Sequence, residues 1–314
     1  MEKRKIEKAI DYIQDSIHEI SIELENEKND KRKLELSKLV DSLENLLVFI
    51  EENRRWNGDL DNMAYFGISA KNEEQKLALR ALDNDKPITI LTGTSGVGKS
   101  LLAQAVGLEK VIETKEFKRL IYTRLQVDVG ADRGFLPGSD GEKLYPYIAP
   151  FLDNLDVMSS ENSNIKDYLL FEGQDDSKKK VFFDSIQSIR GRSLDGWIII
   201  DEVQNLDIHT ITAIATRLKA ENAKLILMGN FSQIDDKKLR NTEQNGFYQL
   251  LKGLYEKDPE QEFFDHINMV QTHRHPVVDL IEDILRTDKN VDPVFYELEN
   301  RGTLKEYNNK YGII

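Results

Sequence analysis

One short segment constrains the fold of this chain more than any other feature. It reads Gly93-Thr94-Ser95-Gly96-Val97-Gly98-Lys99-Ser100 and matches the P-loop pattern at every required position. An apolar run over residues 88–91 precedes it, and a helical pattern over residues 101–105 follows it. Glycines in such a loop let backbone N–H groups turn toward phosphate oxygens at the start of a helix. A buried strand, a phosphate-binding loop and a helix are therefore predicted in this order.

The residues of this loop have distinct expected roles. Lys99 is expected to reach the β- and γ-phosphates as a catalytic residue, and the Ser100 hydroxyl is expected to ligate Mg²⁺. ATP and Mg²⁺ are the predicted cofactors. A glycine-rich turn that binds no nucleotide is the alternative, and the matching strand and helix disfavour it. The predicted nucleotide-binding residues of the loop are Gly93, Thr94, Ser95, Gly96, Val97, Gly98, Lys99 and Ser100.

A second motif supplies two carboxylates. The apolar run Trp197–Ile200 leads directly into Asp201 and Glu202. Because parallel strands end at the same edge of a sheet, both carboxylates are expected beside the P-loop. Asp201 suits the Mg²⁺ shell, and Glu202 suits a base that deprotonates the attacking water. The alternative is a capping pair for a helix that begins near Ile208.

Other apolar runs extend this pattern into a fold class. Residues 120–122 and 225–228 are also almost continuously apolar, as are strands that are buried on both faces. The sequence therefore predicts an α/β fold in which helices sandwich a parallel sheet.

The first 50 residues follow a different pattern. Apolar residues recur every three or four positions, a polar break follows at residues 26–30, and the apolar pattern then resumes. Two amphipathic helices joined by a turn are predicted, with a helical hairpin over residues 1–56 and an ATPase domain over residues 57–314. The hairpin either packs on its own body or serves as an oligomerisation or partner-docking arm. The apolar positions are Ile6, Ile10, Ile13, Ile17, Ile20 and Leu24, then Leu36, Leu39, Leu43, Leu46 and Ile50.

Composition excludes several classes of protein. The 43 Lys and Arg residues against 56 Asp and Glu give a net charge of −13, which argues against coating nucleic acid by bulk charge. The absence of Cys excludes a disulfide scaffold and a thiol nucleophile. No apolar run approaches the roughly 18 residues of a membrane span, and the first residues lack a signal peptide. We therefore expect a cytoplasmic protein without a membrane partner.

Further motifs resemble a known family. The two segments after the carboxylates, residues 201–205 and 229–235, resemble motifs II and III of superfamily 1 helicases. More specifically, the chain resembles the PhoH-like family of ATPases with a single RecA-like core, from about residue 66 to about residue 285. The remaining matching segments are Phe66-Gly67-Ile68 with Gln75, Gly134-Phe135-Leu136-Pro137-Gly138, Arg190-Gly191-Arg192-Ser193 and Thr272-His273-Arg274-His275-Pro276.

The resemblance implies roles for individual residues. Gln75 looks like the residue that hydrogen-bonds the adenine edge, and Gln204 and Gln233 look like sensors of the γ-phosphate. Arg274 resembles an arginine that stabilises transition-state charge. Arg124 occupies the position of an arginine beside the family's nucleic-acid motif.

Two positions depart from the family pattern. Asn230 replaces the usual Asp of motif III, and Leu125 replaces the Pro that usually follows the arginine.

The resemblance also implies an activity and an assembly. A single core lacks half of the ATP clamp of a two-lobed helicase, so a neighbouring subunit is expected to supply an arginine in trans, with Arg190 and Arg192 as alternatives to Arg274. The predicted function is Mg-dependent ATP hydrolysis coupled to binding, translocation or unwinding of single-stranded RNA or DNA by a homo-oligomer, as a hexameric ring. An ATP-gated assembly or protein-remodelling module is the alternative. A nucleotide switch with little turnover is a weaker one, because Glu202 favours hydrolysis.

Overall fold

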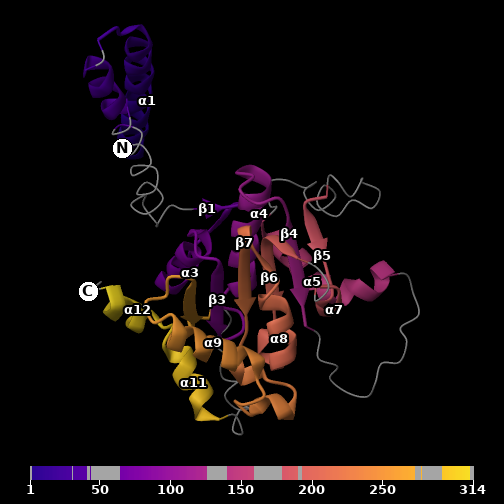
Figure 1. Ribbon diagram of the computed structural model, residues 1–314. Helices are drawn as coiled ribbons and strands as arrows, with labels where there is room; N and C mark the ends of the chain where they lie inside the picture. Colours follow the sequence, from indigo (N-terminus) through magenta and orange to yellow (C-terminus); the bar gives the residue numbers. More distant parts are fainter. Residues whose placement is uncertain are drawn as a thin grey trace. The chain divides into compact units, whose positions relative to one another are not determined.

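The computed structural model describes residues 2–29, 31–40, 43, 64–125, 140–158, 179–189, 193–272, 277 and 292–311. The chain divides into two units, Met1–Met63 and Ala64–Ile314, each of which is a body of its own (Figure 1). The predicted boundary between residues 56 and 57 lies outside the described residues.

The first unit is a helical hairpin. Helix α1 spans Glu2–Asn26, and residues 31–40 form a second helix. The Asn29 Oδ1 caps the second helix, because it accepts hydrogen bonds from the Lys31 and Arg32 backbone N–H groups at 3.0 and 3.2 Å. Arg32 also pairs with Glu23 across the turn, at 3.4 Å. The predicted N-terminal helices are confirmed, and among the described residues Leu36 is buried while Tyr12 and Leu34 are exposed.

The second unit alternates strands and helices. Its sequence begins with a small antiparallel pair of strands, β1 and β2, and then builds a larger sheet. The elements are β1 Ala64–Tyr65, β2 Ile68–Ser69, α3 Glu73–Asp83, β3 Ile88–Gly93, α4 Lys99–Leu108, the π-helical turn η2 Glu109–Glu113, β4 Leu120–Arg124, α5 Asp140–Met158, β5 Val181–Phe183, α7 Ile186–Ile189 and β6 Leu194–Asp201. They continue with the 3-10 turn η3 Val203–Asn205, α8 Ile208–Ala215, β7 Leu218–Met228, the 3-10 turns η4 Phe231–Gln233 and η5 Lys237–Arg240, α9 Gly246–Lys257, β8 Phe264–Met269, α11 Pro293–Asn300 and α12 Leu304–Tyr311.

The large sheet has six strands in the order β5-β4-β6-β7-β3-β8, and all its pairings are parallel. Every predicted buried strand lies in it. Strand β7 lies between β3, which leads into the P-loop, and β6, which ends at Asp201. The RecA-like α/β fold with an N-terminal helical hairpin is therefore confirmed.

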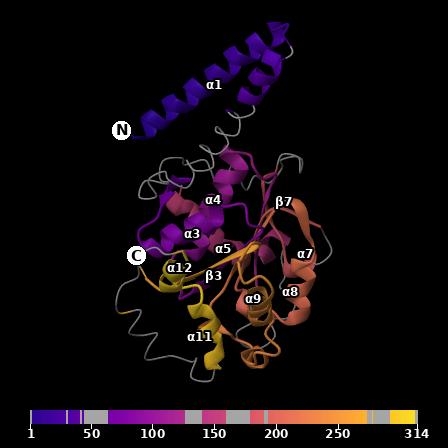
Figure 2. The same cartoon turned by 60° about the vertical axis from the view of Figure 1, so that its left-hand side comes forward.

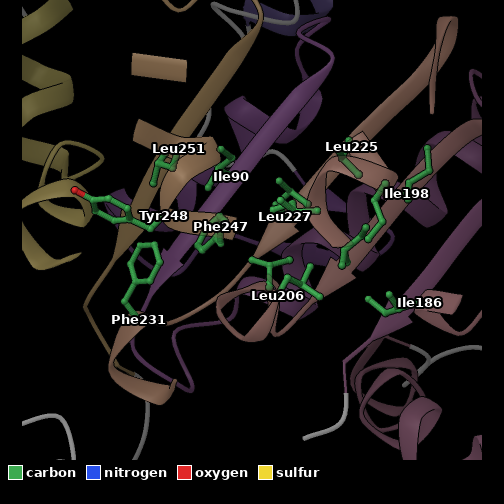
Figure 3. Packing of buried hydrophobic residues seen from close by; sticks show 14 of the residues in the cluster. Ile90, Ile186, Ile198, Leu206, Leu225, Leu227, Phe231, Phe247, Tyr248 and Leu251 are labelled. Carbon is green, nitrogen blue, oxygen red and sulfur yellow. The ribbon is translucent and has the colours of Figure 1, made fainter. Parts of the chain in front are cut away.

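Helices cover both faces of this sheet. On one face α8, α9 and α11 pack against Ile90, Ile198, Leu225 and Leu227 from the three strands β3, β6 and β7 (Figure 3). On the other face α4 lies against β6 and β7, and α5 lies against β4 (Figure 2). There the Trp197 Nε1 donates to the Ala103 carbonyl at 3.1 Å. Burial on both faces explains why these strands read as continuous apolar runs.

Within the described part of the chain, no helix is both long and apolar enough to cross a membrane.

Candidate nucleotide-binding site

The P-loop is held against strand β8 by a close backbone approach. Gly93 has φ 116°, and a Cβ atom there would lie 1.9 Å from the Met269 carbonyl oxygen. Gly98 has φ 98° at the N-cap of α4, and no side chain caps that helix end. Glycine alone adopts this backbone without steric cost, so the start of α4 presents N–H groups for an anion.

The P-loop lysine lies within its own loop. The Lys99 Nζ donates to the carbonyls of Gly93 and Thr94, both at 2.7 Å. The Thr94 Oγ1 is buried and has no hydrogen-bond partner among the residues that the structure describes. An ammonium and an orphaned hydroxyl inside a glycine-rich loop fit a ligand with anionic oxygen atoms.

Strand β6 brings the first carboxylate to the end of α4. The Ser100 Oγ donates to the Asp201 Oδ2 at 3.3 Å, and the Tyr122 hydroxyl donates to the same oxygen at 3.2 Å. Burial raises the pKa of the Asp201 carboxyl, and the Glu202 charge raises it further, while Arg124 and Lys99 oppose the rise. A cation placed beside Asp201 would favour the ionised form.

These oxygen atoms fit the chemistry of Mg²⁺. No cluster of three or more His, Cys, Asp or Glu side chains suited to a metal occurs in the described ranges. A cation here would take oxygen from Ser100 and Asp201 and its other ligands from phosphates and water. Mg²⁺ is held in that way in nucleotide sites, by one or two protein oxygens and the substrate.

The capping alternative for the two carboxylates does not apply. The N-cap of α8 is Asp207, whose Oδ1 accepts from the Thr210 backbone N–H at 2.7 Å. Asp201 and Glu202 are therefore not used to begin that helix.

Glu202 has an unusual backbone and two side-chain partners. Its φ is 61°, in the left-handed region, which residues other than glycine and asparagine rarely adopt. Its Oε1 accepts from the Arg124 Nη2 at 2.8 Å, and its Oε2 accepts from the Gln204 Nε2 at 2.7 Å. The carboxylate is thus held between strand β4 and the segment that follows β6.

Gln204 links motif II to motif III. It is fully buried, and its Nε2 donates to the Gln233 carbonyl at 3.2 Å as well as to Glu202. Its Oε1 accepts from the Asn230 backbone N–H at 3.1 Å. The side chain therefore connects the two motifs inside the protein, and its contact with a nucleotide stays a prediction. The Gln233 side chain is exposed beside this network, and its role as a γ-phosphate sensor also stays a prediction.

The residues at both departures from the family pattern make local hydrogen bonds. The Asn230 Oδ1 accepts from the Ser232 N–H and hydroxyl at 2.9 and 2.7 Å, as an N-cap does. The Leu125 backbone N–H donates to the Asp201 carbonyl at 3.2 Å, a hydrogen bond that proline cannot make.

Gln75 lies against the P-loop from helix α3. It is buried, its Nε2 donates to the Val97 carbonyl at 2.9 Å, and its Oε1 accepts from the Lys71 N–H at 2.8 Å. These bonds brace the loop from outside. The predicted contact with adenine remains untested by this geometry.

Several predicted residues lie outside the described ranges. They are Arg274 with its neighbours His273 and His275, the pair Arg190 and Arg192, and the segment 134–138.

Two buried glutamates of this region were not predicted from the sequence. The Glu74 Oε2 accepts from the Val270 and Gln271 N–H groups at 2.8 and 2.9 Å, just after strand β8. Glu299 on α11 accepts from the Phe231 N–H at 3.3 Å. Burial raises the pKa of Glu299 to about 7, against the effects of that hydrogen bond and of Lys99. Both glutamates contact residues far away in the sequence, so no local pattern identifies them.

Comparisons of the sequence with known proteins all identify one family. The family described as PhoH-like protein matches residues 67–286. Protein PhoH2 of Bacillus subtilis is 34% identical over 72% of this chain and 49% of its own length, and Protein PhoH2 of Mycolicibacterium smegmatis is 31% identical over 70% and 48%. The chain therefore spans about half the length of these curated relatives. Among solved structures, the large terminase of a thermophilic bacteriophage matches 67% of this chain and 49% of its own, with a TM-score of 0.40 and 13% identity.

Proposed function

The chain belongs to the PhoH-like protein family, a family of P-loop ATPases, and from that premise we propose that it hydrolyses ATP with Mg²⁺ as a homo-oligomer acting on single-stranded RNA or DNA. One observation carries the catalytic part of this proposal. The Ser100 hydroxyl at the start of α4 lies 3.3 Å from Asp201 at the end of β6, with Glu202 next in the chain. The proposed metal-binding pair and the proposed base are therefore close to the start of the helix that follows the P-loop, which supports these roles.

Each residue of the site has a task in this reaction. Lys99 moves from the Gly93 and Thr94 carbonyls to the phosphates, and the loop N–H groups hold the phosphate oxygens. Ser100 and Asp201 would hold Mg²⁺, which when bound neutralises charge on the phosphates. Glu202 accepts the proton of the attacking water.

Two further residues complete the proposed mechanism. Gln233 senses the γ-phosphate, and Arg274 stabilises the charge of the transition state, in its own subunit or in the next one.

The nucleic-acid part of the proposal is supported by cations near the site. Arg124 ends strand β4 at the same edge as the P-loop, and Lys237 and Lys238 are exposed just after motif III. Guanidinium and ammonium groups along one edge can follow a phosphate backbone. Because such binding would depend on contacts between these cations and phosphates, it is expected to weaken steeply as salt concentration rises.

ATP turnover measurements test the proposal. The full chain is expected to hydrolyse ATP only with Mg²⁺, and Lys99→Ala and Glu202→Gln are each expected to lower the rate by a factor on the order of 10²–10³. Single-stranded RNA or DNA is expected to raise the rate at low salt. If turnover occurs but no strand binds or stimulates at low salt, the protein is instead an ATP-gated assembly or protein-remodelling module, which its acidic balance favours.

A mixing experiment tests the oligomer. Lys99→Ala and Arg274→Ala subunits are each expected to be inactive alone. Mixed, they regain activity if Arg274 of one subunit completes the neighbouring site. A mixture with no activity at any ratio contradicts an Arg274 that acts in trans.

A further inference from the structure

The side chain of Glu202 is held by one residue of strand β4 and one residue of the turn η3. Arg124 on β4 engages one carboxylate oxygen at 2.8 Å, and Gln204, which is tied to motif III, engages the other at 2.7 Å. A base must direct a free lone pair at its water, so each of these partners affects where Glu202 can act.

The order of the strands determines the side from which Arg124 and Gln204 each hold the Glu202 carboxylate. Strand β4 lies on the far side of β6 from β7 and β3, and β3 carries the P-loop. Arg124 pairs in register with Asp201, so its guanidinium draws the next residue, Glu202, away from the P-loop strand. Gln204 holds the same carboxylate from the side of β7 through the Gln233 and Asn230 backbone.

We propose that Arg124 is a positioning residue that restrains Glu202 in the resting enzyme, and that an anionic phosphate chain which takes the Arg124 guanidinium releases Glu202 for hydrolysis. Both clauses rest on the proposed function: the first rests on Glu202 as the base of ATP hydrolysis, and the second rests also on the binding of nucleic acid. Arg124 is 31% exposed and Glu202 is 26% exposed, so the pair is open to a competing anion. Guanidinium binds phosphate in two-pronged geometry, which makes a nucleic-acid backbone an effective competitor for a carboxylate.

The test measures ATP turnover of the full chain without nucleic acid. Arg124→Gln is expected to raise the basal rate roughly threefold to fivefold, the size expected from losing a part-exposed ion pair. The KM for ATP is expected to stay unchanged, because Arg124 does not contact the P-loop. Arg124→Lys keeps the charge and is expected to retain most of the restraint. In a Glu202→Gln background Arg124→Gln is expected to change nothing, since it acts through Glu202.

Lys219→Gln is the matched control. Lys219 pairs with Asp195 at 3.3 Å between β7 and β6, at the opposite end of the strands. Its loss is expected to leave the basal rate unchanged. If Arg124→Gln does not fold, Arg124→Ala decides the question.

The outcomes separate the two ideas. A basal rate that is unchanged or lower in the Arg124 variant overturns the restraint. A faster variant whose parent is not stimulated by oligonucleotide retains the restraint and removes the nucleic-acid part of the proposed function. If inorganic polyphosphate raises the rate of ATP turnover as strongly as an oligonucleotide does, phosphate chains in general release Glu202 from Arg124. Absence of turnover in parent and variants overturns both ideas.

Discussion

Glu299 is a carboxylic acid in an apolar setting close to the site. It lies buried on α11, next to the Phe231 N–H that begins the motif III turn. Burial raises its pKa to about 7, above the ordinary value of 4.5. The folded chain therefore binds this proton more tightly than the unfolded chain does, and folding stability from this group rises as pH falls from about 7 toward 4.5.

We expect Glu299→Gln to stabilise the protein at alkaline pH. The amide removes the cost of a buried charge and still accepts from Phe231, so the free energy of unfolding should rise by about 1–3 kcal/mol near pH 8. The gain should shrink toward about pH 5, where folded Glu299 is already protonated. Urea unfolding at both pH values measures this.

Glu297→Gln, on the exposed side of the same helix, is the control and should show no such pH-dependent gain. A Glu299→Gln variant that is less stable at pH 8 would contradict the expectation.

Among the elements, the first turn of α3 holds two parts of the site together. Glu74 binds the backbone just after β8, and its neighbour Gln75 binds the P-loop. Glu74→Ala leaves two N–H groups without their acceptor and should lower the free energy of unfolding by about 1–3 kcal/mol. Glu74→Gln keeps an acceptor oxygen and should cost less.

Chemical denaturation of the two Glu74 variants and of Glu73→Ala measures how much the hydrogen bonds of Glu74 stabilise the fold. Glu73 is 67% exposed and pairs only with Lys76 nearby, so its loss should cost less than about 0.5 kcal/mol. Equal losses for Glu73→Ala and Glu74→Ala would show that the β8 segment is not held by Glu74.

Local patterns predicted much of this fold from sequence. The P-loop, its strand and helix, and the strands ending near Arg124 and Asp201 all have short-range signals, namely glycine spacing and continuous apolar runs. The position of β7 between β3 and β6 has none, because strand order depends on contacts between distant residues.

The site residues also divide into those with a short-range sequence signal and those placed by contacts between distant residues. Ser100 and Asp201 were each predicted as a ligand of Mg²⁺, and the structure shows a hydrogen bond between them. The bond between Arg124 and Glu202 was not predicted, because it depends on register between β4 and β6. Whether a buried glutamine such as Gln204 faces ligand or protein also depends on tertiary packing.

For the whole molecule, the division into two units predicts independence of folding. Among the described residues, the buried core cluster that includes Ile90 and Phe247 lies within the second unit. Removing residues 1–56 should therefore leave the melting temperature of the remainder within about 2–4 °C, the change produced by about 1 kcal/mol in a domain of this size.

Calorimetry measures that change, and light scattering with and without ATP on both chains assigns the role of the hairpin. A lower mass after truncation identifies the hairpin as an assembly arm. A large fall in the melting temperature would instead show that the hairpin packs on its own body.

The left-handed backbone of Glu202 bears on how this sequence was selected. A chain selected only to fold would place glycine or asparagine at φ 61°, because a longer side chain there raises the energy of the native state. Glutamate at that position is a departure from the most stable sequence, and drift alone would tend to erase it. Glu202→Gly is therefore expected to give a protein that folds at least as well and hydrolyses ATP more slowly by a factor on the order of 10²–10³, an exchange of activity for stability at a single residue.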